Sequence, residues 1–234
     1  MKKQQERGKL IVFEGVEGCG KTTQLRSLRD WLIVKGWQEI ASLAVNTSSA
    51  PKFLVTREPG GTELGGRLRQ LLLDGHHQEI QERAELLLYA ADRAQHVAEL
   101  LQPHLAQGTI ILCDRYTDST VAYQGKGRGL SLSLITQLNQ IATVGLESDL
   151  TLWLDVDVEI GLSRTRQRGA ADRMEKANLA FHQRVQQGYQ ELAQTYPHRI
   201  VRIDGGGTPE GVQQKVCQVI SQRFAEWNYP LLPH

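Results

Sequence analysis

Residues 10–22 read LIVFEGVEGCGKT, and this stretch decides the fold. Its first four residues form a short apolar run rich in branched side chains, which is typical of a buried strand. The part from residue 15 to residue 22 matches the pattern G-x-x-x-x-G-K-T. After it, apolar residues recur at helical spacing at Leu25, Leu28, Trp31 and Leu32. A strand, a glycine-rich turn and a helix in this order predict a phosphate-binding loop.

The chemistry of this loop follows from its residue types. Glycines let successive backbone N–H groups point at phosphate oxygens, and the helix that follows directs its positive N-terminal end at the same place. We expect Lys21 to reach the β- and γ-phosphates of a nucleotide and the Thr22 hydroxyl to ligate Mg²⁺. The predicted ATP-binding loop therefore comprises Gly15, Val16, Glu17, Gly18, Cys19, Gly20, Lys21 and Thr22.

Composition favours one domain spanning residues 1–234. The chain is 40% hydrophobic, enough for one sizeable core, and its length suits a single α/β domain. A net charge of +1 gives no field that would attract nucleic acid or an anionic membrane. With neither a signal peptide nor a membrane-spanning run, a cytoplasmic protein is expected. The cysteines are three and widely spaced, which predicts reduced thiols, with Cys19 as a candidate redox-sensitive one.

Four more strand-like runs alternate with helical stretches along the chain, at residues 53–56, 109–113, 150–154 and 199–203. Together with the first run they predict a doubly wound α/β fold with a five-stranded parallel sheet flanked by helices. Ligands of such sheets bind beyond the carboxyl ends of the strands. The segments that leave these ends are therefore the places to search for chemistry.

Two predicted strand ends carry arginines. Arg57 precedes a Pro-Gly-Gly turn that lets the backbone approach a ligand, and its guanidinium can form a bidentate contact with a phosphate monoester. Asp114 could hold a Mg²⁺-bound water or poise a phosphate oxygen for attack, and Arg115 could bridge donor and acceptor phosphates. Ion pairs without a catalytic role are the alternative, which the position of these strand ends disfavours.

Tyr89 and Arg93 are four residues apart in a helical stretch predicted over residues 79–101, so they share one face. An aromatic plane and a guanidinium in this arrangement could stack on a base and bond its edge. Taken alone, the pair favours the alternative of core packing plus a surface charge.

Residues 164–175 crowd four arginines around a glycine, at Arg164, Arg166, Arg168 and Arg173. Such a segment is costly to pack and easy to move, which suits a mobile lid that closes on phosphates and excludes water. A solvated basic face is the alternative. The phosphate loop favours the lid, because an arginine delivered to a transferring phosphoryl group can raise the rate ~10³-fold or more.

Taken together, the motifs resemble the thymidylate kinase family in its bacterial form. The resemblance rests on residues 13–24, 56–62, 87–96, 114–116, 119–125 and 172–173, and it runs from about residue 10 to residue 224. It implies transfer of the γ-phosphate of ATP to dTMP, giving dTDP, with Mg²⁺ required. It also implies a homodimer.

The resemblance implies roles for single residues as well. Arg57 and Arg115 would hold the dTMP phosphate, Tyr89 would stack near thymine, and Arg93 would bond the edge of the base. Tyr123 would sit against the sugar where a 2′-hydroxyl would collide. The rest of the dTMP-binding set is Glu17, Ser119 and Gln124, and the metal set is Thr22, Glu17 and Asp114.

One subclass of the family carries an arginine in the phosphate loop, where this chain has Gly18 and Cys19. The resemblance therefore moves the catalytic cation to the lid, without choosing among its arginines. The predicted catalytic set is Lys21, Asp114, Arg115, Arg164, Arg168 and Arg173. Residues 46–51 have no counterpart in the family and receive no role.

Two rival functions can be weighed on the sequence. A kinase for another nucleoside monophosphate, or for a deoxynucleoside, would keep the loop and the lid but change the pocket around Tyr89, Arg93 and Tyr123. A nucleotide-dependent switch would need a guanine-reading N-K-x-D segment, which is absent, and a D-x-x-G segment after the third strand. The only D-x-x-G begins at Asp204, after the last predicted strand.

Overall fold

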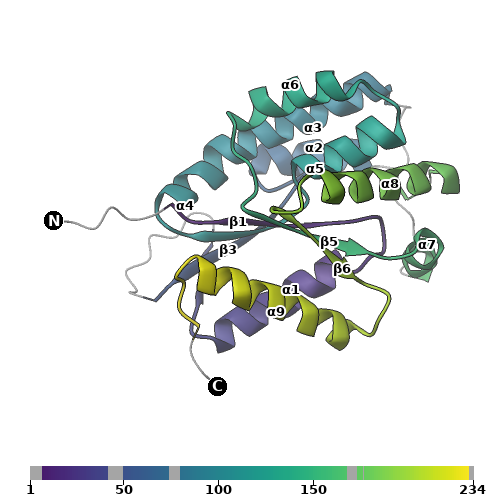
Figure 1. Ribbon diagram of the computed structural model, residues 1–234. Helices are drawn as coiled ribbons and strands as arrows, with labels where there is room; N and C mark the ends of the chain where they lie inside the picture. Colours follow the sequence, from purple (N-terminus) through teal and green to yellow (C-terminus); the bar gives the residue numbers. More distant parts are fainter. Residues whose placement is uncertain (1–6, 42–49, 74–79, 168–172, 176, 232–234) are drawn as a thin grey trace.

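A computed structural model describes residues 7–41, 50–73, 80–167, 173–175 and 177–231 (Figure 1). Within these residues six parallel strands form one sheet in the order β2-β3-β4-β1-β5-β6. The strands are β1 (Leu10–Glu14), β2 (Gln38–Glu39), β3 (Lys52–Arg57), β4 (Ile110–Asp114), β5 (Leu150–Asp155) and β6 (Ile200–Asp204). The doubly wound α/β fold predicted from the sequence is confirmed.

The predicted number of five strands is wrong by one. The additional strand, β2, is a two-residue edge strand whose sequence, Gln-Glu, has no apolar run to reveal it. Backbone bonds flanking it, from Gln38 N–H to the oxygen of Pro51 and from Ile40 N–H to that of Phe53, are both 2.9 Å long. The five predicted strands coincide with observed strands to within one residue at each end.

Helices cover both faces of the sheet (Figure 1). One face carries α1 (Lys21–Val34) and α9 (Pro209–Glu226), which pack against each other. The other carries α2 (Glu63–Leu73), α3 (Glu82–His96), α5 (Thr117–Thr120), α6 (Leu132–Thr143) and α8 (Leu179–Thr195). The remaining elements are the π-helices η1 (Val97–Leu101) and η2 (Val121–Gly127), α4 (Gln102–Ala106), and α7 (Val158–Gln167), which follows β5.

The central strand β1 is buried along its whole length. Leu10 and Val12 join an apolar cluster with η1, whereas Ile11 and Phe13 join a cluster that includes residues of α1 and α9. This is why the strand appears in the sequence as a continuous apolar run rather than as an alternating one. Its fixed position sets the place from which the phosphate loop leaves the sheet.

The phosphate loop packs directly onto α7, with no side chain between the two backbones. A Cβ atom added to Gly18 would overlap the carbonyl oxygen of Gly161, and one added to Gly161 would overlap the carbonyl oxygen of Glu17. Gly18 also has a φ of 69°, which disfavours any other residue there. The paired glycines therefore let α7 lie directly against the loop.

We predict that Gly161→Ala destabilises the fold and weakens ATP binding, because α7 must move away from the loop. Overpacking of this kind costs about 1–3 kcal/mol. The matched control is Gly66→Ala in α2, where an added Cβ meets nothing within 4 Å; it should stabilise by up to about 1 kcal/mol. Urea denaturation and the KM for ATP would test the pair, and equal stability of the two variants would contradict the prediction.

Candidate active site

The predicted phosphate loop joins β1 to α1 through glycines in unusual conformations. Gly15, Gly18 and Gly20 have φ angles of 143°, 69° and 97°, a region that favours glycine. Gly20 is the N-cap of α1, and no side chain caps this helix start. The backbone N–H groups of the first turn are therefore available to an anion.

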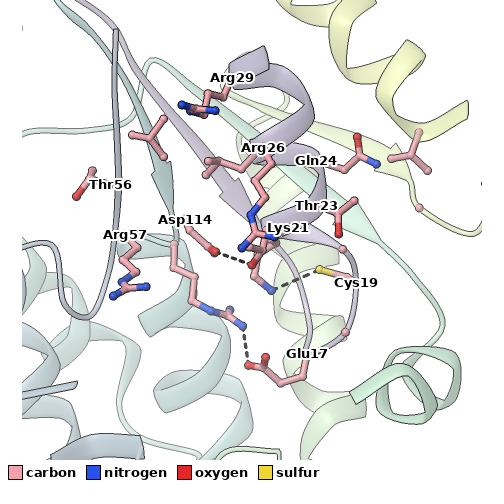
Figure 2. A pocket seen from close by; sticks show the side chains of 18 of the residues that line it. Glu17, Cys19, Lys21, Thr23, Gln24, Arg26, Arg29, Thr56, Arg57 and Asp114 are labelled. Atoms are coloured by element: carbon pink, nitrogen blue, oxygen red, sulfur yellow. Dashed lines mark hydrogen bonds and ion pairs between the residues drawn. The ribbon is translucent and has the colours of Figure 1, made fainter. Parts of the chain in front are cut away.

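Lys21 is the first residue of α1, and its side chain folds back over the loop (Figure 2). Its Nζ donates to the carbonyl oxygens of Gly15, at 3.0 Å, and Val16, at 3.1 Å. The same nitrogen lies 3.4 Å from the Sγ of Cys19, a buried free thiol. The ammonium group is thus held inside the cradle where phosphates would lie.

The loop opens into a cleft of about 1130 Å³ (Figure 2). The cleft extends along α1 and past the ends of β3 and β4. Among the predicted residues, those that line it are Glu17, Gly18, Cys19, Gly20, Lys21, Thr22, Arg57, Asp114, Arg115 and Arg164. The fold therefore gathers residues from four separate segments of the sequence around one hollow.

Asp114, at the end of β4, lines this cleft close to Thr22. The Thr22 hydroxyl lies 3.4 Å from Oδ2 of Asp114. The other oxygen, Oδ1, is buried and has no hydrogen-bond partner among the described residues. Hydroxyl and carboxylate oxygens are ligands that Mg²⁺ prefers, with phosphates and water supplying the others. The pair therefore fits a divalent cation, although the described residues contain no group of three or more His, Cys, Asp or Glu side chains that could hold one.

Arg115 follows β4 with a φ of 72°, which is rare for a residue with a side chain. Its backbone N–H donates to the oxygen of Phe13 on β1, at 3.0 Å. Its guanidinium donates to the carboxylate of Glu17 at 2.6 Å and to the oxygen of Gly15 at 3.1 Å. The left-handed backbone thus turns the side chain back toward the phosphate loop.

Glu17 is held as a carboxylate by its neighbours. Burial raises its pKa, but the charges of Arg115 and Lys21 outweigh burial and lower the pKa of Glu17 to about 2. The Tyr123 hydroxyl also donates to it, at 2.9 Å. Although Glu17 was also predicted as a metal ligand, the structure pairs it with an arginine and a tyrosine.

A second, smaller hollow of about 90 Å³ adjoins the cleft. We call it the acceptor pocket, after the ligand that the sequence analysis predicts for its residues. It gathers seven of the eight residues predicted to bind dTMP, namely Glu17, Tyr89, Arg93, Arg115, Ser119, Tyr123 and Gln124. The eighth, Arg57, lines the larger cleft. Residues that the sequence analysis did not single out complete the lining: Glu58, Pro59, Arg69, Leu73, Tyr116, Thr120 and Met174.

Arg93 is buried, with only 2% of its surface exposed, so the alternative of a surface charge is wrong. Its Nε donates to Glu58 at 2.8 Å and its Nη2 to the oxygen of Tyr116 at 3.0 Å. Its Nη1 donates to Thr120 and Asn139, at 2.9 and 2.8 Å. These four bonds leave one of its five N–H groups for a ligand in the acceptor pocket.

Arg69 on α2 lines both hollows and was missed, because it belongs to no motif. Its Nη1 donates to the oxygen of Pro59 at 3.0 Å. Burial lowers the pKa of Arg69, as do the charges of Arg57 and Arg115. Guanidinium groups brought so close together are typical of a site for a phosphate dianion.

The predicted lid arginines have different surroundings. Arg164, in α7, lines the cleft. Arg173 instead forms an ion pair of 2.6 Å with Glu85, on α3, and donates through Nε to the oxygen of Leu72 at 2.8 Å. Arg168 lies outside the described residues. Arg164 is thus the described lid arginine that stands beside the phosphate loop.

Glu14, a fully buried carboxylate that the sequence analysis also missed, fixes the segment after β4. It accepts hydrogen bonds from the N–H of Tyr116 at 2.8 Å, from the Ser119 hydroxyl at 2.6 Å and from the Tyr189 hydroxyl at 2.7 Å. Burial raises its pKa, with the nearby charge of Asp118 as the next cause. Glu14 therefore supports Arg115 indirectly, through the backbone of the next residue and through the Ser119 and Tyr189 hydroxyls, which accept from the Arg115 guanidinium at 3.2 and 3.4 Å.

A buried network also supports the turn after Arg57. Glu58 accepts from Arg93 and from Nδ1 of His96, each at 2.8 Å. Asp92, which is 1% exposed, accepts from the N–H of Gly60 at 3.0 Å. The turn that follows Arg57 is therefore fastened to α3.

A phosphate loop after the first strand, an Asp-Arg pair at the end of the neighbouring strand and a separate acceptor pocket define a P-loop kinase of small nucleotides. The sequence model of the thymidylate kinase family matches residues 13–216. The chain belongs to the thymidylate kinase family. Among the described residues, no helix is long and apolar enough to cross a membrane.

Close relatives span nearly the whole chain. The chain is 59% identical to thymidylate kinase of Cyanothece sp., over 96% of this chain and 97% of the relative. It is 58% identical to that of Trichodesmium erythraeum, over 95% and 99%. The crystal structure of thymidylate kinase from Ehrlichia chaffeensis matches with a TM-score of 0.71 and 32% identity, over 92% of this chain and 99% of that one.

We predict that Asp92→Asn changes how stability depends on pH. Burial, followed by the charge of Glu58, raises the pKa of Asp92 from 3.8 to about 6. Ionisation of Asp92 therefore destabilises the folded state. This cost is absent below pH 3.8, increases between pH 3.8 and 6, and reaches its full value of about 3 kcal/mol above pH 6.

The asparagine variant lacks this cost. Its free energy of unfolding, relative to that of the natural chain, should be higher at pH 8 than at pH 4 by about 2–3 kcal/mol in urea denaturation. Asp30→Asn, at a side chain that is 68% exposed, is the control. The same difference at both pH values would show that Asp92 titrates in its ordinary range.

Proposed function

We propose that the two hollows divide the substrates between them, with ATP in the cleft and the nucleoside of dTMP in the acceptor pocket, while the phosphate of dTMP lies where the two hollows meet. The chain is an ATP-dependent nucleoside monophosphate kinase that transfers the γ-phosphate of ATP to dTMP, giving dTDP for dTTP synthesis. The observation that carries the site assignment is the position of Arg115. It lines both hollows and donates to both Gly15 and Glu17 of the phosphate loop.

On the donor side, the loop at residues 15–22 would hold the ATP phosphates, with Lys21 at the β- and γ-phosphates. Arg57, Arg69 and Arg115 would hold the phosphate of dTMP, whose oxygen attacks the γ-phosphorus. As that P–O bond forms, the bond to the oxygen of ADP breaks. Because the chemistry consists mainly of positioning and charge stabilisation, a ring of fixed cations is the suitable environment.

Mg²⁺ is the divalent ion we propose for this site. Thr22 and Asp114 would hold it, directly or through water, since their oxygens fit it and Oδ1 of Asp114 is otherwise unpartnered among the described residues. When bound, the ion would neutralise charge on the transferred phosphoryl group. The pairing of Glu17 with Arg115 favours a role for this carboxylate at the sugar of dTMP.

The acceptor pocket also supports selectivity for deoxyribose. The Tyr123 hydroxyl is fixed by Glu17, and the guanidinium of Arg115 stacks 4.8 Å above the Tyr123 ring. A side chain held this firmly cannot move aside for a 2′-hydroxyl. Tyr89 and Gln124 would face the nucleoside, and burial raises the pKa of Tyr89 above its usual range, so its phenol stays neutral.

The proposal also includes a single domain spanning residues 1–234 and a mobile lid at about residues 164–175. Arg164 and Glu175, near its two ends, both line the cleft, which supports it as a boundary of the ATP site. Residues 168–172 lie outside the described residues, as do residues 46–49 of the segment without a family counterpart. We further propose that the enzyme works in the cytoplasm.

Initial ADP release in the presence of Mg²⁺ and ATP would test the acceptor, with dTMP, dUMP, UMP, CMP, AMP, GMP and thymidine compared. We expect a clear preference for dTMP. In the same assay, Asp114→Asn should lower kcat about 100-fold or more and raise the Mg²⁺ requirement, with a small effect on the KM for dTMP. An unchanged Mg²⁺ dependence would remove Asp114 from the metal site.

We also propose a homodimer, because α2, α3 and α6 lie side by side (Figure 1) and carry exposed apolar side chains. Leu64 and Leu71 on α2 are each 47% exposed, Leu87 on α3 is 56% exposed and Ile141 on α6 is 74% exposed. Apolar surface gathered on neighbouring elements marks an interface. A second copy of the chain is the partner we expect there.

We predict that Ile141→Glu shifts the protein toward the monomer, because a charge buried without a partner in the interface is costly. Light scattering coupled to size-exclusion chromatography would measure the mass. Val34→Glu, at a side chain on α1 that is 71% exposed, is the control and should leave the mass unchanged. A monomeric natural chain at micromolar concentration, or a dimeric Ile141→Glu variant, would contradict the proposed interface.

A further inference from the structure

Arg173 and Met174 belong to the arginine-rich segment, yet they are docked on the acceptor side of the site. The N–H of Arg173 donates to the oxygen of Leu73 at 3.4 Å, and its Nε donates to the oxygen of Leu72 at 2.8 Å. Leu72 and Leu73 are the last two residues of α2. Met174 is 3% exposed and lines the acceptor pocket together with Leu73.

One buried carboxylate holds this arrangement. Glu85 on α3 has 0% of its surface exposed. Its Oε2 forms the ion pair with Arg173, at 2.6 Å, while its Oε1 accepts from Nε2 of Gln124, at 2.7 Å. Arg128 donates to both oxygens, at 3.4 and 3.2 Å. The same carboxylate therefore fixes a residue of the arginine-rich segment and an amide of the acceptor pocket.

Consecutive side chains of this segment face different hollows. Met174 lines the acceptor pocket, whereas Glu175 lines the larger cleft beside the phosphate loop. Nη2 of Arg128 lies 3.8 Å from the sulfur of Met174, and the Arg128 guanidinium stacks 4.7 Å above the ring of Phe181. The thioether is thus fixed in place as part of the wall between the two hollows.

We propose that Glu85 is a positioning residue for the acceptor: by docking Arg173 it places Met174 against the nucleoside of dTMP. Met174 then contributes apolar contact to the bound nucleoside, as a polarizable thioether can. Arg173 serves acceptor binding, and phosphoryl transfer falls to other cations. This inference rests on the assignment of the small pocket to dTMP.

Steady-state kinetics on Met174→Ala, Glu85→Gln and Arg173→Gln would test the proposal. Each should raise the KM for dTMP about five- to thirtyfold, as expected for the loss of one buried apolar contact. The kcat and the KM for ATP should stay within about twofold, since none of the three side chains acts on the donor side. Arg173→Lys, which keeps the charge, should recover part of the loss. Arg67→Gln, at a side chain that is 75% exposed on α2, is the control.

A double variant of the two ion-pair partners distinguishes a positioning role from general damage to the fold. The double variant with Glu85→Gln and Arg173→Gln should raise the KM for dTMP no further than the more affected single variant does. Additive effects would overturn the proposal. If Glu85→Gln does not fold, as judged by thermal melting, Met174→Ala still decides, because it leaves every charge in place.

Other outcomes would also overturn it. If Arg173→Gln lowers kcat and raises the KM for ATP while the KM for dTMP is unchanged, Arg173 belongs to the phosphate cleft. Tyr89→Ala identifies which assignment has failed. A raised KM for dTMP in Tyr89→Ala alone would keep the acceptor pocket and reject the role of Glu85 and Met174. An unchanged KM in Tyr89→Ala would reject the pocket assignment and this inference with it.

Discussion

The placement of the Arg115 guanidinium is the constraint on which the rest of the site depends. Its left-handed backbone turns the side chain back toward the phosphate loop, where the guanidinium donates to Gly15 and Glu17. The strain of that conformation is tolerated because the backbone N–H is tied to Phe13 and the guanidinium to Glu17. Glu14 accepts hydrogen bonds from the backbone N–H of the next residue, Tyr116, and from the hydroxyl of Ser119. Together with Glu17, Glu58 and Arg69, the Arg115 side chain lines both hollows, so its position helps to define where the two join.

Ion pairs between distant segments assemble the acceptor pocket. Glu17 of the phosphate loop pairs with Arg115 after β4, Glu58 after β3 pairs with Arg93 on α3, and Glu85 on α3 pairs with Arg173. In each pair the carboxylate and the arginine come from different elements, and the carboxylate of the last two is almost fully buried. Breaking such a pair leaves an uncompensated buried charge, which is costly. The pocket is therefore defined by charge pairing as much as by shape, and the guanidinium groups that face it are already oriented before a ligand arrives.

The arginine-rich segment is anchored at both of its ends to different parts of the enzyme. At its start, the backbone contact between Gly18 and Gly161 sets α7 against the phosphate loop, and Arg164 lines the cleft. At its far end, Arg173 is fastened to α2 and α3. Arginines that look equivalent in the sequence therefore have different environments: Arg164 lines the cleft, whereas Arg173 is paired with the buried carboxylate of Glu85.

The sequence by itself determined the fold class and the phosphate loop, because glycine spacing and buried apolar runs are local features. The predicted acceptor residues came mostly from the resemblance to the family, and the structure gathers seven of them in one pocket. The sequence could not reveal β2, whose two polar residues pair only because β3 lies beside them. It also missed Arg69, Glu14 and Glu85, and it could not separate Arg164 from Arg173. A lone arginine or glutamate in a helix carries no local signal, since its role depends on which distant groups the packing brings to it. Tertiary structure decided those roles by burying carboxylates, which then require cations from other segments of the chain.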